Sequence, residues 1–233
     1  MNLTGSTLTG QSLPSKNIVI SISSIREDSW QSQTDLLASH GIKAIYFLSG
    51  QELESESSKI QYILSLGHSI GVTGWTGNDL GSSSDIVADL RRTDFALKKF
   101  GDGRDLLLRA TTWNSSTADQ VNAAGLGRYV GSIGIDIGQS SSDVNDRHCW
   151  SNSIDVATCV ELYLKDARLR TRGIINFESS GNNSLGLIQV LIPQLKLEGF
   201  SFTTIDQVPE ISSRLAKSRA FQQKNECRDR EYK

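Results

Sequence analysis

The feature that most constrains the fold is a regular alternation of short β-branched runs with longer amphipathic segments. Seven runs have the character of strands, at 18–23, 43–48, 69–73, 106–111, 129–136, 173–178 and 200–205. Six segments between them have helical periodicity, at 30–39, 52–66, 85–100, 118–124, 155–169 and 185–197. Five of these six segments are followed by a glycine, the residue that most readily adopts the left-handed conformation at the end of a helix. The alternation therefore predicts an α/β protein.

The lengths of the intervening helices determine how the strands can pair. Strands joined through helices of ten or so residues cannot form hairpins, and right-handed crossovers make the sheet parallel. Seven such units indicate a closed or nearly closed β/α barrel. The alternative is an open doubly wound sheet, which needs a glycine-rich phosphate turn directly after an early strand. The nearest match, Gly125-Leu-Gly127 followed by Gly131, precedes a strand instead.

Two further features concern the ends of the barrel and its last helix. Pro193 lies within the segment 185–197, so we expect a kink there or a later start of that helix.

We expect one main domain over residues 17–217, preceded by an N-terminal extension at 1–16 and followed by a charged tail at 218–233.

Charge and hydropathy exclude some partners. The chain has 233 residues, with 24 Lys and Arg against 26 Asp and Glu, so it lacks the basic excess that binds nucleic acid. No apolar run approaches the length of about 18 residues that a transmembrane segment needs. The first residues lack the basic start and apolar stretch of a signal peptide, while three sequons, at Asn2, Asn114 and Asn182, are weak evidence for export. We expect a monomer.

The cysteines and histidines are few. Cys149, Cys159 and Cys227 include no Cys-x-x-Cys pair, which argues against a structural zinc site. His148 and Cys149 adjoin each other in the long loop after the fifth predicted strand, where a Cys-His nucleophile is one interpretation and a disulfide of Cys149 is the simpler one.

The carboxyl ends of the predicted strands are where a β/α barrel places its chemistry. They are rich in hydroxyl groups and poor in titrating groups, and no histidine ends a strand. The residues there are Ser23, Ser24, Ser49, Gly50, Thr73 to Gly77, Thr111 to Trp113, Asp136, Glu178 and Asp206.

Several segments resemble the polysaccharide deacetylase (NodB-homology) domain of the chitin deacetylases. They are IVISISSIRED, LLASHGIKAIYFLSG and ILSLGHSIGVTGWTGNDL, followed in the same order by LLRATTWNSS, GIINFE and LKLEGFSFTTIDQV. The resemblance runs from about residue 18 to 208. It implies a distorted (β/α) barrel of about seven parallel strands. It also implies zinc as the family's cofactor, chitin or another N-acetylglucosamine polysaccharide as partner, and a secreted, cell-wall or cell-surface location.

The resemblance places substituted residues at the family's catalytic positions. Ser23 stands where the family has its general base, and Phe177 where it has its general acid. The zinc-ligand positions carry Ser24, Thr73 and Gly77, the last two spaced as on one face of a helical turn. Hydroxyl groups and a glycine cannot hold divalent zinc at useful affinity. We therefore expect no metal and no deacetylase activity.

Arg109 matches the arginine of the family's third motif. In the family this arginine is directed toward the base, which is absent here. An unpaired buried charge is costly, so we expect Arg109 to pair with another acid, Asp136 or Glu178, as a remnant of the site.

The leading hypothesis is therefore a deacetylase-like protein without zinc chemistry that still binds a glycan. The aromatic rings of Trp75, Trp113 and Trp150 are candidates for stacking on sugar rings, although each ring could equally serve packing.

Two hypotheses remain beside it. One is an active N-acetylglucosamine-polymer deacetylase with an unorthodox site built from Asp136, Asp143, Glu178 or His148. The other is an intracellular scaffold without a glycan ligand, which reduced cysteines would favour.

Overall fold

The computed structural model describes residues 3–77, 80, 85–101, 105–138, 144–178 and 181–231, with side chains described up to residue 220. Its sheet has five parallel strands, β1 (Asn17–Ile22), β2 (Ile45–Leu48), β3 (Ser69–Val72), β4 (Gly173–Phe177) and β5 (Ser201–Thr203). The order is β3-β2-β1-β4, and β5 pairs with the first half of β1. The predicted parallel α/β arrangement is confirmed.

Isolated bridges close the sheet into a distorted barrel. Val72 pairs with Leu108, Leu107 with Val130, and Ile137 with Ile175, each in parallel orientation. The predicted strands at 106–111 and 129–136 are thus reduced to single bridges. One reason is that Leu8 of the N-terminal segment forms its own bridge with Ile133, so this part of the wall pairs with two partners in succession.

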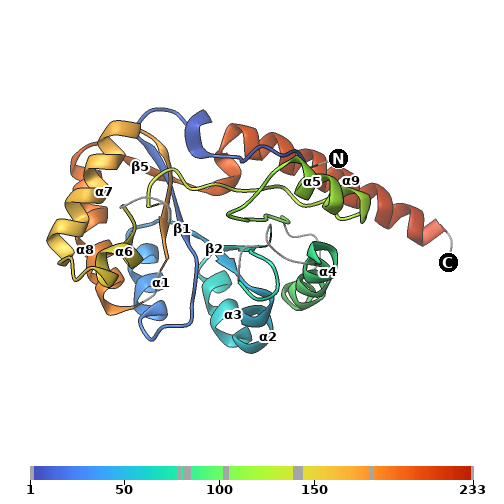
Figure 1. Ribbon diagram of the computed structural model, residues 1–233, viewed down its shortest axis with the longest axis horizontal. Coiled ribbons are helices and arrows are strands. Elements are labelled where there is room, and N and C mark those ends of the chain that lie inside the picture. Colours follow the sequence, from blue (N-terminus) through green and yellow to red (C-terminus); the bar gives the residue numbers. More distant parts are fainter. Residues whose placement is uncertain are drawn as a thin grey trace.

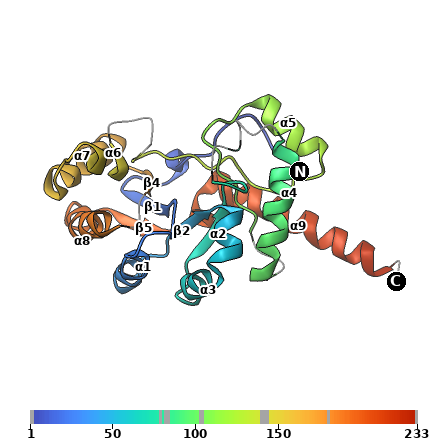
Figure 2. The same ribbon diagram turned by 60° about the horizontal axis from the view of Figure 1, so that its bottom comes forward.

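Helices surround the strands on the outside (Figures 1 and 2). They are α1 (Trp30–Ser39), α2 (Gly50–Ser55), α3 (Ser57–Ser65), α4 (Ile86–Leu97), α5 (Ser115–Ala123), α6 (Asp146–Ser151), α7 (Val156–Arg170), α8 (Asn182–Leu197) and α9 (Pro209–Glu231). Short 3-10 turns lie at Gly10–Ser12, Lys98–Phe100 and Ile205–Gln207.

The helix predictions are largely confirmed, with differences at their ends. The predicted helix at 52–66 is two helices, α2 and α3, which meet at Glu56. α8 contains Pro193 but begins at Asn182, so of the two alternatives for this helix the later start is wrong, and the kink at Pro193 stays a prediction. The five glycines predicted to end helices all have positive φ, between 73° and 106°: Gly41, Gly67, Gly101, Gly125 and Gly199.

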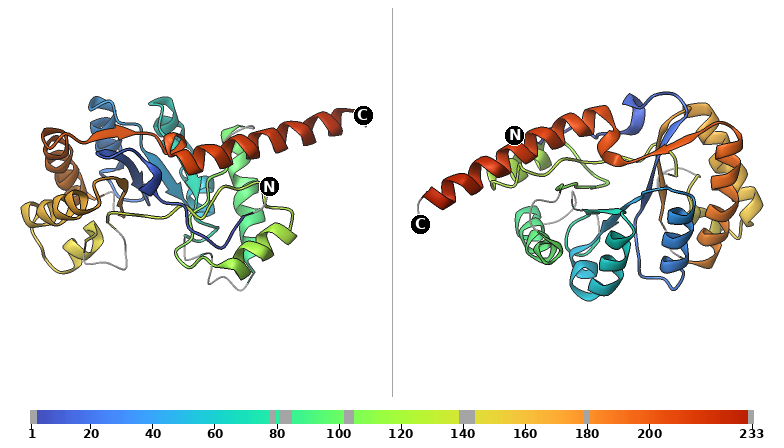
Figure 3. Two further views of the ribbon diagram at one scale, coloured as in Figure 1. Left: turned by 90° about the horizontal axis from the view of Figure 1, so that it is seen from above. Right: turned by 180° about the vertical axis from the view of Figure 1, so that it is seen from behind.

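Helix α9 was not predicted as a helix. Its first turns bury Ile211 and Leu215 against the inside of the barrel. The rest of the helix projects beyond the body of the protein (Figure 3), and the expected boundary at residue 217 falls within it. Among the described residues no helix is long and apolar enough to cross a bilayer.

The core consists of two layers that follow from strand alternation. Side chains on one face of each strand, such as Val19, Ile45 and Ile174, point into the barrel, where Leu8 and Leu13 of the N-terminal segment join them. The opposite faces of the strands pack against the helices, as Ile20 and Phe177 do. This alternation decides which residues at the strand ends can reach the barrel mouth.

His68, just before β3, is buried as a neutral imidazole. Its Nδ1 accepts a hydrogen bond from the Ala44 amide at 3.0 Å, and the side chain is almost fully buried. Burial, helped by the charge of Lys43, lowers the pKa of His68 to about 4. The unfolded chain takes up this proton near pH 6.5, so protein stability should fall as the pH drops from there toward 4.

We expect this residue to cost about 2–3 kcal/mol of stability between about pH 7 and pH 4. Urea unfolding at both pH values should therefore show a smaller loss for His68→Gln than for the wild type. His40→Gln, at the partly exposed end of α1, is the matched control and should follow the wild type. Equal losses in His68→Gln and wild type would contradict the prediction.

Candidate functional site

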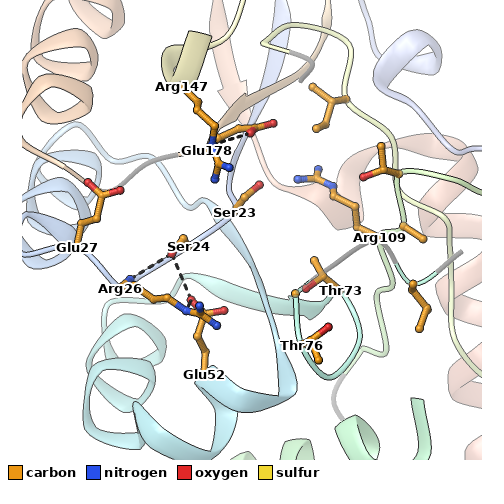
Figure 4. Close-up of a pocket in the computed structure, with 15 residues that line it drawn as sticks. Ser23, Ser24, Arg26, Glu27, Glu52, Thr73, Thr76, Arg109, Arg147 and Glu178 are labelled. Carbon is orange, nitrogen blue, oxygen red and sulfur yellow. Dashed lines mark hydrogen bonds and ion pairs between the residues drawn. The ribbon is translucent and has the colours of Figure 1, made fainter. Parts of the chain in front are cut away.

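A cavity of about 490 Å³ opens at the carboxyl ends of the strands (Figure 4). Ser23 and Ser24 reach it from the end of β1, and Thr73 and Gly77 from the loop after β3. This loop is not helical, so the expected helical turn between Thr73 and Gly77 is wrong. Thr76, Arg109, Thr111 and Glu178 are further sequence-predicted residues that the fold brings together here.

Phe177 does not line the cavity. It is fully buried on the outer face of β4, where its ring stacks on Tyr163 with centroids 5.6 Å apart. Strand alternation then turns Glu178, the next residue, toward the cavity. Glu178 is therefore the side chain that the end of β4 presents to a ligand.

Asp136 is also not part of the cavity lining. Its carboxylate accepts hydrogen bonds from the Gly10 amide at 2.7 Å, the Ile174 amide at 2.9 Å and the Gln11 side chain at 3.0 Å. These bonds tie the N-terminal segment to β4. The role of Asp136 in the structure is to anchor this segment.

Arg109 forms the floor of the cavity without a salt bridge to any described carboxylate. It donates to the Ile133 carbonyl at 3.1 Å, to Asn176 Oδ1 at 2.9 Å and to Ser21 Oγ at 3.1 Å. The expected salt bridge to Asp136 or Glu178 does not form among the described residues: the hydrogen-bond acceptors of Arg109 are neutral groups of the barrel wall, and Glu178 acts on it only through its charge. Burial lowers the pKa of Arg109 to about 9, and the charge of Glu178 partly opposes this effect.

Four charged residues of the cavity, Arg26, Glu27, Glu52 and Arg147, are not among the candidates that the sequence suggested. Ser49 and Glu52 form a capping box at the start of α2, and the spacing Ser-x-x-Glu after a strand could have revealed it. The buried Glu52 carboxylate also accepts from Ser24 Oγ at 3.3 Å and lies 3.6 Å from Arg26 Nε. The positive charge that lies beside Ser24 and Glu52 is therefore the guanidinium group of Arg26.

The opposite rim is ordered by Asp146, in the first turn of α6. Its buried carboxylate accepts from the Glu178 amide at 2.8 Å and from Ser184 Oγ at 2.6 Å. Ser184 Oγ in turn accepts from Trp150 Nε1 at 2.8 Å. Glu178 itself lies 3.5 Å from the exposed Arg147. Asp146 therefore positions both Glu178 and Trp150.

The three predicted stacking tryptophans have different surroundings. Trp75 is 8% exposed, and the guanidinium of Arg92 covers its ring at 3.5 Å. Trp113 donates to the Thr4 carbonyl at 2.7 Å and packs against the core. Trp150 lines a second cavity of about 440 Å³, which shares Glu27 and Arg147 with the first. Trp150 is thus the tryptophan placed beside the site.

The remaining candidates lie elsewhere. Cys149 forms a disulfide with Cys159, so it has no free thiol to act as a nucleophile. His148, on α6, contacts Asn152 through Nδ1 at 3.3 Å and is not among the residues lining the cavity. Asp143 lies outside the described residues, as does the side chain of Cys227.

The donor set of the cavity does not fit a zinc ion. Ser24 and Thr73 offer hydroxyl groups, Gly77 offers no side chain, and Arg26 brings a positive charge. Within the described parts of the chain, no group of three or more His, Cys, Asp or Glu side chains could hold a metal. These residues therefore support no metal-dependent reaction step.

The comparisons with known proteins agree with this fold. A family model described as polysaccharide deacetylase matches residues 10–128. No curated protein matches. Among solved structures, Bc1960, a peptidoglycan N-acetylglucosamine deacetylase, is 17% identical with a TM-score of 0.68, covering 88% of this chain and 92% of its own.

Two further structures have the same fold. PdaA of Bacillus subtilis, a family 4 carbohydrate esterase, is 18% identical with a TM-score of 0.69, covering 83% of this chain and 80% of its own. BA3943 of Bacillus anthracis, a CE4 family pseudoenzyme, is 14% identical with a TM-score of 0.68, covering 83% of this chain and 65% of its own. Because the family model spans more than half of the residues, this chain belongs to the polysaccharide deacetylase family.

Proposed function

We propose that this protein has lost zinc-dependent deacetylase activity and acts as a glycan-binding protein of a cell wall or cell surface. The observation that carries the proposal is the donor set at the barrel mouth. Ser24, Thr73 and Gly77 line the cavity where the family resemblance expects metal ligands, and Arg26 stands beside them. Such a set can bind a polar ligand but cannot acidify a metal-bound water.

The fold is compatible with such a loss. BA3943 is named as a pseudoenzyme, and a mutant of that protein, with a TM-score of 0.67 to this chain, is named as having restored enzymatic activity. The barrel of that protein therefore persists in both states. This supports the interpretation that the present chain has kept the frame while its ligands changed.

Glycan binding is supported by the two adjoining cavities. The first is lined by hydroxyl groups, arginines and glutamates, which suit the many hydroxyl groups of a sugar. The second presents Trp150, whose Nε1 is fixed by Ser184 while the residue is only partly buried. An aromatic ring beside a polar cleft is a suitable stacking surface for a sugar ring.

A secreted or surface location is supported by the disulfide. Cys149 and Cys159 are joined, and disulfides persist mainly in oxidising compartments. The name of Bc1960 as a peptidoglycan deacetylase points to the cell wall for that relative. The disulfide also counts against the intracellular scaffold. For the active-deacetylase alternative, Glu178 is the candidate that lines the cavity, whereas Asp136 anchors the N-terminal segment.

We expect the purified protein to bind no stoichiometric zinc and to release no acetate from chitooligosaccharides or peptidoglycan. Metal analysis after dialysis against zinc, and an acetate assay against a buffer blank, test this directly. In a sedimentation assay the protein should nevertheless be retained by insoluble chitin or peptidoglycan. Acetate release above the blank would favour the active alternative, and absence of retention would remove the glycan-binding role.

A further inference from the structure

The floor of the cavity carries a positive charge that lacks a counter-ion among the described residues. Arg109 is 7% exposed. Its acceptors are the carbonyl oxygens of Ile133 and Gly134, Asn176 Oδ1 and Ser21 Oγ, all of them neutral. A buried charge without an opposite partner is costly. Its presence at the floor of an open cavity points to a counter-ion that comes with the ligand.

Hydrogen-bond donors around this charge exceed the acceptors. The guanidinium has five N–H groups, and its four bonds leave one N–H on Nη1 without an acceptor in the described structure. The hydroxyl groups of Thr73 and Thr111 also line the cavity and are available as donors. A ligand that supplies acceptor oxygens would satisfy these groups.

One face of Arg109 is covered and the other faces the cavity. Its guanidinium carbon lies 3.8 Å from the centre of the Phe47 ring, on the inside of the barrel. Its guanidinium extends toward Ser23, which also lines the cavity (Figure 4). The ligand can therefore approach the cation from the mouth of the barrel.

Three glutamates line the cavity, Glu27, Glu52 and Glu178, and none of them forms a salt bridge with Arg109 in the part of the chain that the structure describes. Glu52 has Arg26 at 3.6 Å, and Glu178 has Arg147 at 3.5 Å. Each of these two acids thus has an arginine of its own. Although Glu178 raises the pKa of Arg109 somewhat, burial has the larger effect, and at a pKa of about 9 the group remains a cation at neutral pH.

We propose that the cavity binds a carboxylate carried by a sugar, so that the polysaccharide recognised by this protein is an acidic one. The carboxylate is held by Arg109, with the hydroxyl groups of Thr73 and Thr111 as further donors, and the next sugar unit lies toward Trp150. A planar carboxylate matches the guanidinium better than a single hydroxyl or amide oxygen does. The volume of about 490 Å³ lies in the usual range for small-ligand sites.

This inference rests on the proposed glycan-binding function, and the test separates the two. Calorimetry at low salt compares three probes: a hyaluronan tetrasaccharide, which alternates glucuronate with N-acetylglucosamine, the neutral chitotetraose, and free glucuronate. We expect the acidic tetrasaccharide to bind at least about tenfold more tightly than the neutral one. Free glucuronate should bind weakly and compete with the acidic tetrasaccharide.

Two variants and a control locate the site. Ser23→Asp brings a carboxylate next to Arg109, because Ser23 Oγ and Arg109 Nη1 both contact Asn176 Oδ1, at 3.0 and 2.9 Å. This substitution replaces none of the residues that accept hydrogen bonds from the Arg109 guanidinium, and it should abolish the preference for the acidic probe. Arg109→Gln should do the same. Arg168→Gln, on the outer helix α7, removes an equal charge far from the cavity and should change nothing.

Each outcome decides a different point. Equal affinity for the acidic and neutral tetrasaccharides would overturn the carboxylate site and leave glycan binding intact. Binding of glucuronate that is lost in Ser23→Asp, without binding of either tetrasaccharide, would support the carboxylate site and overturn polysaccharide recognition. An acidic preference that persists in both variants would place the anion elsewhere and overturn the inference.

Discussion

Replacing Asp146 with alanine should lower the free energy of unfolding by about 3–5 kcal/mol, because the change leaves two or more buried donors without an acceptor. The Glu178 amide and Ser184 Oγ both donate to this carboxylate. The bond from the backbone amide of residue 146 to the Tyr163 hydroxyl does not involve the carboxylate and should remain. The loss should spread from α6 to the end of β4.

Urea unfolding of Asp146→Ala against wild type measures this effect. Asp119→Ala, an exposed acid on α5, is the matched control and should change stability by less than about 0.5 kcal/mol. Retention of Asp146→Ala by insoluble polysaccharide should also weaken, since Ser184 no longer holds Trp150 through the same chain of bonds. A stability change as small as that of the control would show that the carboxylate is not a structural anchor.

Restoring metal ligands should create a zinc-binding site at the mouth of the barrel. The combined change Ser24→Asp, Thr73→His and Gly77→His places a carboxylate and two imidazoles around the cavity. The buried Glu52 carboxylate, 3.3 Å from Ser24 Oγ, lies close enough to assist. We expect a dissociation constant on the order of 10 μM, or roughly 7 kcal/mol, without acetate release.

Two features of the structure limit this affinity. Gly77 has a φ of 78°, a conformation that a histidine adopts only with strain, and a Cβ there would lie 3.3 Å from Ser49 Cβ. Arg26 contributes a positive charge beside the new ligands. The double variant Ser24→Asp with Thr73→His, which avoids the strained position, should bind zinc more weakly than the triple variant. No heat of zinc binding by a folded triple variant would mean that the barrel mouth has a different shape from that of active relatives.

The predictability of the fold depended on whether a pattern was local or not. Runs such as 18–23 and 173–178 are short, mostly apolar and separated from the neighbouring runs by helical segments, so their strand character and parallel orientation were predictable, although which strands pair was not. The run at 129–136 looked equally strand-like, but its pairing depends on Leu8, which is more than a hundred residues away. No local pattern contains such a partner. α9 was missed for the related reason that its long polar part shows little apolar periodicity.

For the site, the sequence by itself determined the residues at the strand ends, and so the absence of imidazole and carboxylate ligands at Ser24, Thr73 and Gly77. The tertiary structure decided how the charges are paired. Arg109 was expected to need an acid, but the barrel wall surrounds it with carbonyl, amide and hydroxyl oxygens from distant segments. Similarly, α2 brings Glu52 to Arg26 and α6 brings Arg147 to Glu178. Residue types follow from the chain alone, whereas the balance of buried charge depends on which segments the folded barrel brings within a few ångströms of each other.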